Sequence, residues 1–238
     1  MQKRGISHIE VILSFVIFVT AVGFALFFFS PFNSERLVES SLSYGFREIS
    51  KNVSVSIETF GVLVNNSGDN LPNNGIGILI EGVNAGGNKN VRVEQDEQIA
   101  DSRIDGDIVS VANLEEGEIF LFLKIGEGYV SFSPEPEVQT VSEEFYEISS
   151  WETEEFISES RFDVLGEAYN SNYDGLRDDF NLPRRAGFGF AIVFDDGDKI
   201  EAYREVPEGL EVFSKNERVG VLRNNGEIEF VDLIVKVW

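Results

Sequence analysis

Apolar residues form one long run near the start of the chain and then change to shorter, alternating patterns. The residues from Val11 to Phe29 carry no charge and are rich in Val, Ile, Leu and Phe. At about 1.5 Å per residue, a helix of this length covers the roughly 30 Å of hydrocarbon in a bilayer. The pattern therefore predicts a transmembrane helix over about residues 9–30. Lys3 and Arg4 precede it, so the positive-inside rule places the N-terminus in the cytoplasm and the C-terminal domain outside.

A second helix is expected directly after the first. Pro31 interrupts the apolar run, because proline has no backbone N–H and crowds the preceding turn. Over residues 34–52 apolar positions recur at nearly helical spacing, which indicates an amphipathic helix with one face on a folded domain. These positions are Leu37, Val38, Leu42, Phe46 and Ile49.

From Val53 onward the period shortens to two residues, which is typical of strands. Val53, Val55 and Ile57 alternate with polar residues, and short apolar runs follow with Asn, Gly and Asp clusters between them. Short strands at this rhythm predict that residues 53–133 form the first part of a β-rich head, as a β-sandwich or a barrel-like sheet. The further runs cover 61–64, 76–83, 91–94, 108–111, 119–125 and 129–132.

The segment 134–159 has a different composition. It contains nine acidic residues and no Lys or Arg, and its aromatic and aliphatic residues argue against simple disorder. Three interpretations stay open: an acidic strand, an acidic helix edge, or a bridge between two β lobes.

Residues 160–238 are expected to form a helix followed by hairpins. The spacing of apolar residues predicts a helix over 160–181, which ends before Pro183. Two strand-like runs then turn through Asp-Asp-Gly-Asp at 195–198 and Asn-Asn-Gly at 224–226, and Asn-Gly is a strong hairpin signal. Whether this part is one domain with the first β-rich part stays open. The expected fold class is α+β, mainly β: an N-terminal transmembrane helix, then an extracytoplasmic β-sandwich or barrel-like head with one further helix.

The first residues of the chain resemble the processing site of type IV prepilins and pseudopilins. Residues 5–11 read Gly-Ile-Ser-His-Ile-Glu-Val after a short basic leader, and they align without gaps with the common bacterial form Gly-Phe-Thr-Leu-Ile-Glu-Leu. An archaeal variant of the motif keeps the Glu in the same register. The chain departs from the family pattern at His8, where an apolar residue is usual, and at Ile6, where the archaeal variant has Gln.

This resemblance implies a route of processing and assembly. Residues 1–5 would be a leader that a membrane prepilin peptidase removes between Gly5 and Ile6, which leaves 6–52 as the N-terminal helix. Glu10 would then pair with the free amino group of a neighbouring subunit's Ile6, since a buried carboxylate and a buried ammonium are tolerable together but costly alone. The implied partners are membrane lipid, the prepilin peptidase and other pilin-like subunits.

Composition and charge exclude several classes of function. The chain has 42 Asp and Glu against 19 Lys and Arg, a formal net charge of −23, no cysteine and one histidine. The acidic excess argues against nucleic acid as a partner, because phosphate backbones need clustered Lys and Arg. Thiol catalysis, Cys-type zinc sites and multi-histidine centres are excluded, and an exported domain without disulfides favours an archaeal-type pilin. No catalytic motif is present, so no enzyme activity and no cofactor are expected.

Three acidic or amide-rich segments imitate cation sites. Residues 170–181 place oxygen-bearing side chains at several positions of an EF-hand loop, but Asn181 stands where a bidentate Glu is required. The Asp-Gly clusters at 105–107 and 195–198 lie between predicted strands, where Asp and Gly are turn formers. No metal site is therefore expected.

Two Asn-x-Ser sequons lie on the outward side of the predicted membrane helix. They begin at Asn52 and Asn65, and glycosylation at either position is a hypothesis. If it occurs, the modified residue lies at the protein surface.

The sequence thus favours a type IV pilin-like or pseudopilin-like subunit with a structural or adhesive role. It would be stored in the membrane and then packed, helix against helix, into a surface filament or pseudopilus. The alternative is an uncleaved, signal-anchored extracytoplasmic protein whose acidic β-rich domain binds a cation, a glycan or another partner. An anchored hydrolase that uses unassigned carboxylates is a third and weaker hypothesis.

Overall fold

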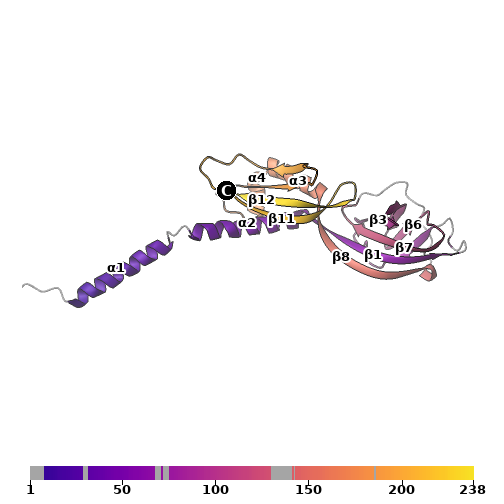
Figure 1. The fold of residues 1–238 in the computed structure, drawn as a ribbon, viewed down its shortest axis with the longest axis horizontal. Helices are drawn as coiled ribbons and strands as arrows, with labels where there is room; N and C mark the ends of the chain where they lie inside the picture. Colours follow the sequence, from indigo (N-terminus) through magenta and orange to yellow (C-terminus); the bar gives the residue numbers. More distant parts are fainter. Residues whose placement is uncertain are drawn as a thin grey trace, which may run out of the picture.

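The structure is a computed structural model of the chain. It describes residues 8–28, 32–67, 71, 75–129, 141, 143–184 and 186–238. Figure 1 shows an elongated molecule, in which two helices lead from one end into a long curved sheet. The elements are, in chain order, α1 (His8–Phe28), α2 (Phe32–Val53), β1 (Ser54–Asn66), β2 (Ile76–Leu79), β3 (Asn90–Gln95), β4 (Gln98–Ala100), β5 (Ser102–Asp105), β6 (Ile108–Val111), β7 (Gly117–Gly126), η2 (Glu143–Phe145), β8 (Tyr146–Ser158), α3 (Glu159–Ser171), α4 (Tyr173–Asp179), β9 (Phe188–Val193), β10 (Lys199–Ala202), β11 (Phe213–Leu222) and β12 (Ile228–Val237).

The N-terminal part is helical, as the sequence predicted. α1 carries the long apolar run, and α2 covers the amphipathic segment expected over 34–52. Among the described residues, no helix is both long and apolar enough to cross a membrane. The leader 1–5 and Pro31, the predicted break between the helices, lie outside the described residues.

α2 packs on the sheet through one apolar stripe. Leu42, Phe46, Ile49 and Val53 recur every three or four residues and are buried, so they lie on one helix face. This face contacts β11, β12 and α3. α2 ends at Val53 and β1 begins at Ser54, so the helix continues into a 13-residue strand without a loop.

Most strands belong to one continuous sheet. Its nine strands follow the order β10-β9-β12-β11-β8-β1-β7-β3-β4, and a second sheet has the order β2-β6-β5. Neighbours in the large sheet are antiparallel except β8 and β11, which pair in parallel at only two positions, Val221 with Ile157 and Leu222 with Ser158. The fold is therefore α+β and mainly β, as predicted.

Two large apolar cores divide this sheet into two lobes. In the proximal lobe, α2, α3 and α4 pack with β9, β11 and β12, and in the distal lobe the small sheet covers β1, β3 and β7. A smaller cluster of Val55, Ile57, Tyr129, Phe156 and Leu222 joins the lobes. In β12 the buried residues alternate with partly exposed ones, as expected for a strand with one face on a core.

The structure refines several predictions. In the described residues, the predicted β-sandwich or barrel-like head is one sheet shared by both lobes, and the small sheet packs on it in the distal lobe. The single helix predicted over 160–181 is two helices, because the Asn172 side chain accepts a hydrogen bond from Gly175 N (3.3 Å) and caps α4. The strand predicted at 129–132 is not formed at Tyr129, and its remainder lies outside the described residues.

Local turn signals gave correct hairpins. β9 pairs with β10 across the turn at 195–198, and β11 pairs with β12 across the turn at 224–226. The described part of the acidic segment forms η2 and β8, which matches the acidic strand among the three interpretations.

Candidate functional site

The most unusual surface of the molecule is α1. Every side chain from residue 10 to 26 is exposed, on all sides of the helix. A helix that is apolar all round is stable only when lipid or other protein surfaces cover it. The large apolar residues exposed on α1 are Val11, Ile12, Leu13, Phe15, Val16, Ile17, Phe18, Val19, Val22, Phe24 and Leu26.

Glu10 lies in the first turn of this helix. It is the only Asp, Glu, Lys or Arg of α1, and an acidic side chain is favourable at a helix N-terminus, where the macrodipole is positive. The two residues of the predicted processing site, Gly5 and Ile6, lie outside the described residues, as does the side chain of His8. The structure therefore places the carboxylate at the start of an exposed apolar helix.

The two sequons occupy different local structures. Asn52 is exposed in the last turn of α2, and its Nδ2 donates to Glu48 O at 2.8 Å. Asn65 is exposed near the end of β1, and its Oδ1 accepts from Ser67 N at 3.1 Å in a local turn. Both side chains are at the surface, and their glycosylation stays a prediction.

The EF-hand imitation at 170–181 lies mostly in helices α3 and α4. Its oxygen atoms do not surround one point, because Asn172 caps α4 and Asp174 pairs with Arg177 at 2.8 Å. The cluster at 105–107 is the turn between β5 and β6, with Gly106 at φ 58°. In the described part of the chain, no three His, Cys, Asp or Glu side chains form a group that could hold a metal ion.

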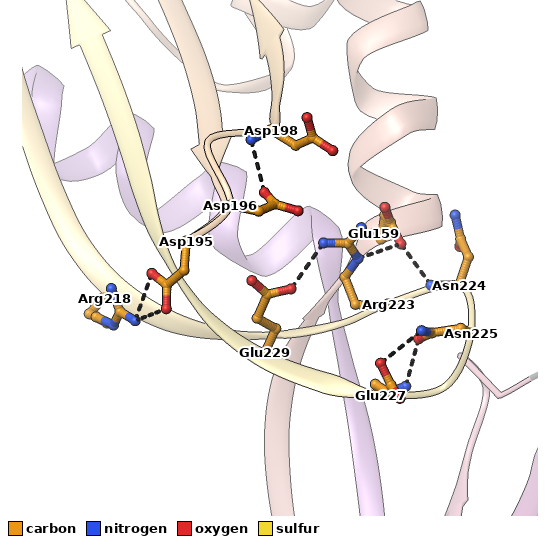
Figure 2. A network of polar contacts seen from close by, with 10 residues as sticks. All are labelled: Glu159, Asp195, Asp196, Asp198, Arg218, Arg223, Asn224, Asn225, Glu227 and Glu229. Carbon is orange, nitrogen blue, oxygen red and sulfur yellow. Dashed lines mark hydrogen bonds and ion pairs between the residues drawn. The ribbon is translucent and has the colours of Figure 1, made fainter.

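Figure 2 shows the third acidic cluster, the turn between β9 and β10. Both carboxylate oxygens of Asp195 accept from Arg218 Nη2, at 3.1 and 3.0 Å. Asp196 Oδ1 accepts from the backbone N–H of Asp198 at 2.9 Å, which is the local bond of a tight turn. These contacts stabilise the hairpin turn, and the first carboxylate of the cluster, Asp195, is bound by Arg218.

Arg223 makes the central contacts of the same region. Its Nε lies 3.3 Å from Glu159 Oε2, its Nη1 lies 3.0 Å from Glu229 Oε2, and its guanidinium carbon lies 3.8 Å from the centroid of the Phe194 ring (Figure 2 shows the two carboxylates). Glu159 also accepts from Asn224 N at 2.7 Å. The β11–β12 turn is thereby fixed to the start of α3.

Like charges also accumulate on α3 beside this network. Burial, together with the nearby carboxylates of Glu159 and Glu167, raises the pKa of Asp163. Glu159, Asp163 and Glu167 are spaced four residues apart and therefore share one helix face, where like charges repel. Arg223 is the cation that balances the first of them.

We expect Arg223→Ala to lower the free energy of unfolding by about 1–2 kcal/mol, because it leaves Glu159 and Glu229 without their shared cation and removes the contact with Phe194. Denaturant unfolding followed by tryptophan fluorescence measures the change. Arg218→Ala is the matched control, since that arginine binds only an exposed turn. An equal loss in both variants would contradict the central role of Arg223.

Sequence reasoning missed one candidate surface. β8 has nine consecutive exposed residues, 147–155, although it lies in the middle of the strand order. The signal was Ile148 and Trp151 among glutamates, two apolar residues whose separation of three does not fit the two-residue period of a half-buried strand. Both are exposed, and Trp151 is 66% exposed.

Comparison with known proteins gives no match: no family model, no curated protein and no solved structure is similar to this chain.

Proposed function

We propose that the protein is a type IV pilin-like or pseudopilin-like structural subunit. The observation that carries the proposal is α1: a helix exposed and apolar on all sides, with Glu10 as its only acidic residue, in the first turn. α1 is followed by α2, which is amphipathic and packs on a β-rich head. The apolar surface of α1 must therefore be buried by lipid or by other subunits, whereas the apolar face of α2 is already buried on the head.

Two successive environments bury the apolar surface of α1. Before assembly, residues 9–30 lie in membrane lipid, with the N-terminus inside and the head outside; this range is longer than the part of α1 whose side chains are described. In the filament, the α1 helices of neighbouring subunits replace the lipid. Glu10 then binds the free amino group of a neighbouring Ile6, because each charge is costly in apolar surroundings without the other.

The head supports a structural or adhesive role. Its glutamates and aspartates give it a strong negative charge, which keeps exposed heads soluble and separate. The acidic turns at 105–107 and 195–198 take part in local structure.

The first test of this proposal is proteolytic processing. Co-expression with a prepilin peptidase should shorten the chain by residues 1–5, so that Ile6 becomes the N-terminus, and intact-mass spectrometry measures the difference. Gly5→Ala should block this cleavage, because the motif that the chain resembles has glycine before the cut and alanine adds a Cβ there. A Ser7→Ala variant, which changes an adjacent residue, is the matched control and should be cleaved normally.

An intact Met1 after co-expression with an active peptidase would contradict the proposal. That result would favour the alternative of an uncleaved anchored protein with an acidic binding domain. A known prepilin expressed in the same cells confirms that the peptidase is active.

A further inference from the structure

Among the described strands, none pairs with the long outer edge of β8 over most of its length. On one side β8 pairs with β1 from Ser54–Ile157 to Val64–Tyr146, but on the other side it pairs with β11 only at Ile157 and Ser158. Within the described residues, no strand pairs with the outer edge from 146 to 156. An unpaired edge presents a row of backbone N–H and C=O groups, which can receive another strand.

The side chains of this edge are exposed on both faces of the sheet. Residues 147–155 are all exposed, whereas several of their β1 neighbours are buried. Trp151 lies opposite Phe60 and stacks on it, with ring centroids 6.5 Å apart and an interplanar angle of 26°. Trp151 thus rests on Phe60 while most of its surface stays exposed, which makes it an apolar anchor beside the edge.

The charge of the edge is entirely negative. β8 contains Glu147, Glu152, Glu154 and Glu155 and no Lys or Arg. In the part of the chain that the structure describes, none of the four forms an ion pair. Glu155 lines a shallow cavity with Arg47 and Lys51, so cations lie near it. Glu152 and Glu154 are therefore the carboxylates whose charge a binding partner would balance.

This charge decides between possible occupants. A second copy of β8 would place glutamates opposite glutamates, and like charges across a strand pair are destabilising. Residues 130–140, which precede β8, contain Glu135 and Glu137 and no Lys or Arg, so they do not supply positive charge. The complementary occupant is therefore a basic segment of a different protein.

We propose that the outer edge of β8 is a docking site for an extended basic segment of a partner protein, which adds to the sheet as a further strand. Glu152 and Glu154 lie opposite Thr59 and Ile57 and share one face, so the added strand presents Lys or Arg at alternate positions on that face. On the other face, that of Trp151, it presents an apolar or aromatic residue.

A β-bulge limits the length of this site. The pairing of β8 with β1 shifts between Gly61 and Val62, and Ser149 Oγ donates to Gly61 O at 3.0 Å at this irregularity. A bulge interrupts the regular ladder of backbone groups, so the straight edge runs from Trp151 to Phe156. The matching segment is about six residues long, with basic and apolar positions in alternation.

Binding of a synthetic peptide to the full chain in detergent micelles tests this inference. The probe is a fluorescently labelled, end-capped peptide that alternates Lys and Val with one central Phe, and its fluorescence anisotropy reports binding. We expect saturable binding, and no binding of the peptide with Glu in place of Lys. Glu152→Gln combined with Glu154→Gln should weaken binding about tenfold, because it removes both unpaired carboxylates.

Two controls separate strand addition from simple charge attraction. The matched variant, Glu208→Gln with Glu211→Gln, makes the same charge change on an exposed loop and should leave binding unchanged. Two N-methylated peptides, each blocking one set of alternate amides, should differ: the set that faces β8 is required and the other is dispensable. Equal binding of both N-methylated peptides, or an unchanged affinity of the Glu152 and Glu154 variant, would overturn the proposal.

The outcome is independent of the proposed assembly role. The peptide binds the head, whereas processing and filament formation are properties of the N-terminal helix. Failure of the peptide experiment therefore leaves the pilin-like proposal in place, and an uncleaved chain that still binds the peptide retains this docking site.

Discussion

Replacing Phe188 with alanine should lower the free energy of unfolding by about 3–5 kcal/mol, because it leaves a cavity in the centre of the proximal lobe. The ring of Phe188 is fully buried and lies among four aromatic rings. The distances between centroids are 5.3 Å to Tyr169, 5.1 Å to Tyr173, 5.8 Å to Phe180 and 6.4 Å to Phe190, all in the range of favourable aromatic packing.

The polar groups of this cluster remain satisfied in the variant. Phe188 N donates to the Tyr173 hydroxyl, and Phe188 O accepts from the Tyr169 hydroxyl, so both bonds use backbone atoms that alanine also has. Burial raises the pKa of Tyr169, which keeps this hydroxyl protonated and able to donate. The measured loss is therefore that of the ring alone.

Fluorescence of Trp238, next to Gly187 in the proximal lobe, reports the unfolding once Trp151 is replaced by Phe. Phe230→Ala is the matched control, since Phe230 is 59% exposed on β12 and its loss should cost under about 1 kcal/mol. Equal losses for Phe188→Ala and Phe230→Ala would show that the aromatic cluster is not the core of this lobe.

The second large effect concerns assembly. Glu10→Ala should be processed normally but should reduce the subunit in sheared filaments or pseudopili about tenfold or more, because the amino group of a neighbouring Ile6 would be buried without its partner. Glu10→Asp keeps the charge on a shorter side chain and should give an intermediate yield. Quantitative immunoblotting of the sheared and membrane fractions measures both.

Thr20→Ala is the matched control within the same helix. Thr20 Oγ1 donates to Val16 O of its own helix at 2.8 Å, so its loss changes polarity in α1 without removing a charge. Normal assembly of the Glu10→Ala subunit, or an equal defect in Thr20→Ala, would exclude the proposed charge pair.

Local sequence signals predicted local structure well in this chain. The Asp-Gly and Asn-Gly turns gave the β9–β10 and β11–β12 hairpins, because turn chemistry acts over a few residues. The amphipathic spacing of Leu42, Phe46 and Ile49 likewise gave the face of α2 that is buried. Glu10 could also be selected from sequence, because an acidic residue next to a long apolar run is conspicuous without knowledge of the fold.

Features that depend on strand order could not be predicted in this way. β8 lies between β1 and β11, strands that are far from each other in sequence, and no local signal specifies this neighbour relation. The split of the predicted helix at Asn172 was also missed, since asparagine is compatible with a helix interior until its side chain caps the next turn. The open edge of β8 follows from its short pairing with β11, which covers only two residues of β8, so it became visible only in the structure.

The direct junction of α2 and β1 determines how the molecule carries tension. Figure 1 shows α2 and β1 following one another along the length of the molecule, and β1 is bonded to β7 on one side and β8 on the other. A pull on the N-terminal helices enters the sheet at Ser54 and acts along the strand. It therefore loads the backbone hydrogen bonds on both sides of β1 in shear, many at once, instead of opening them one after another. A head attached in this way resists being pulled from its helix.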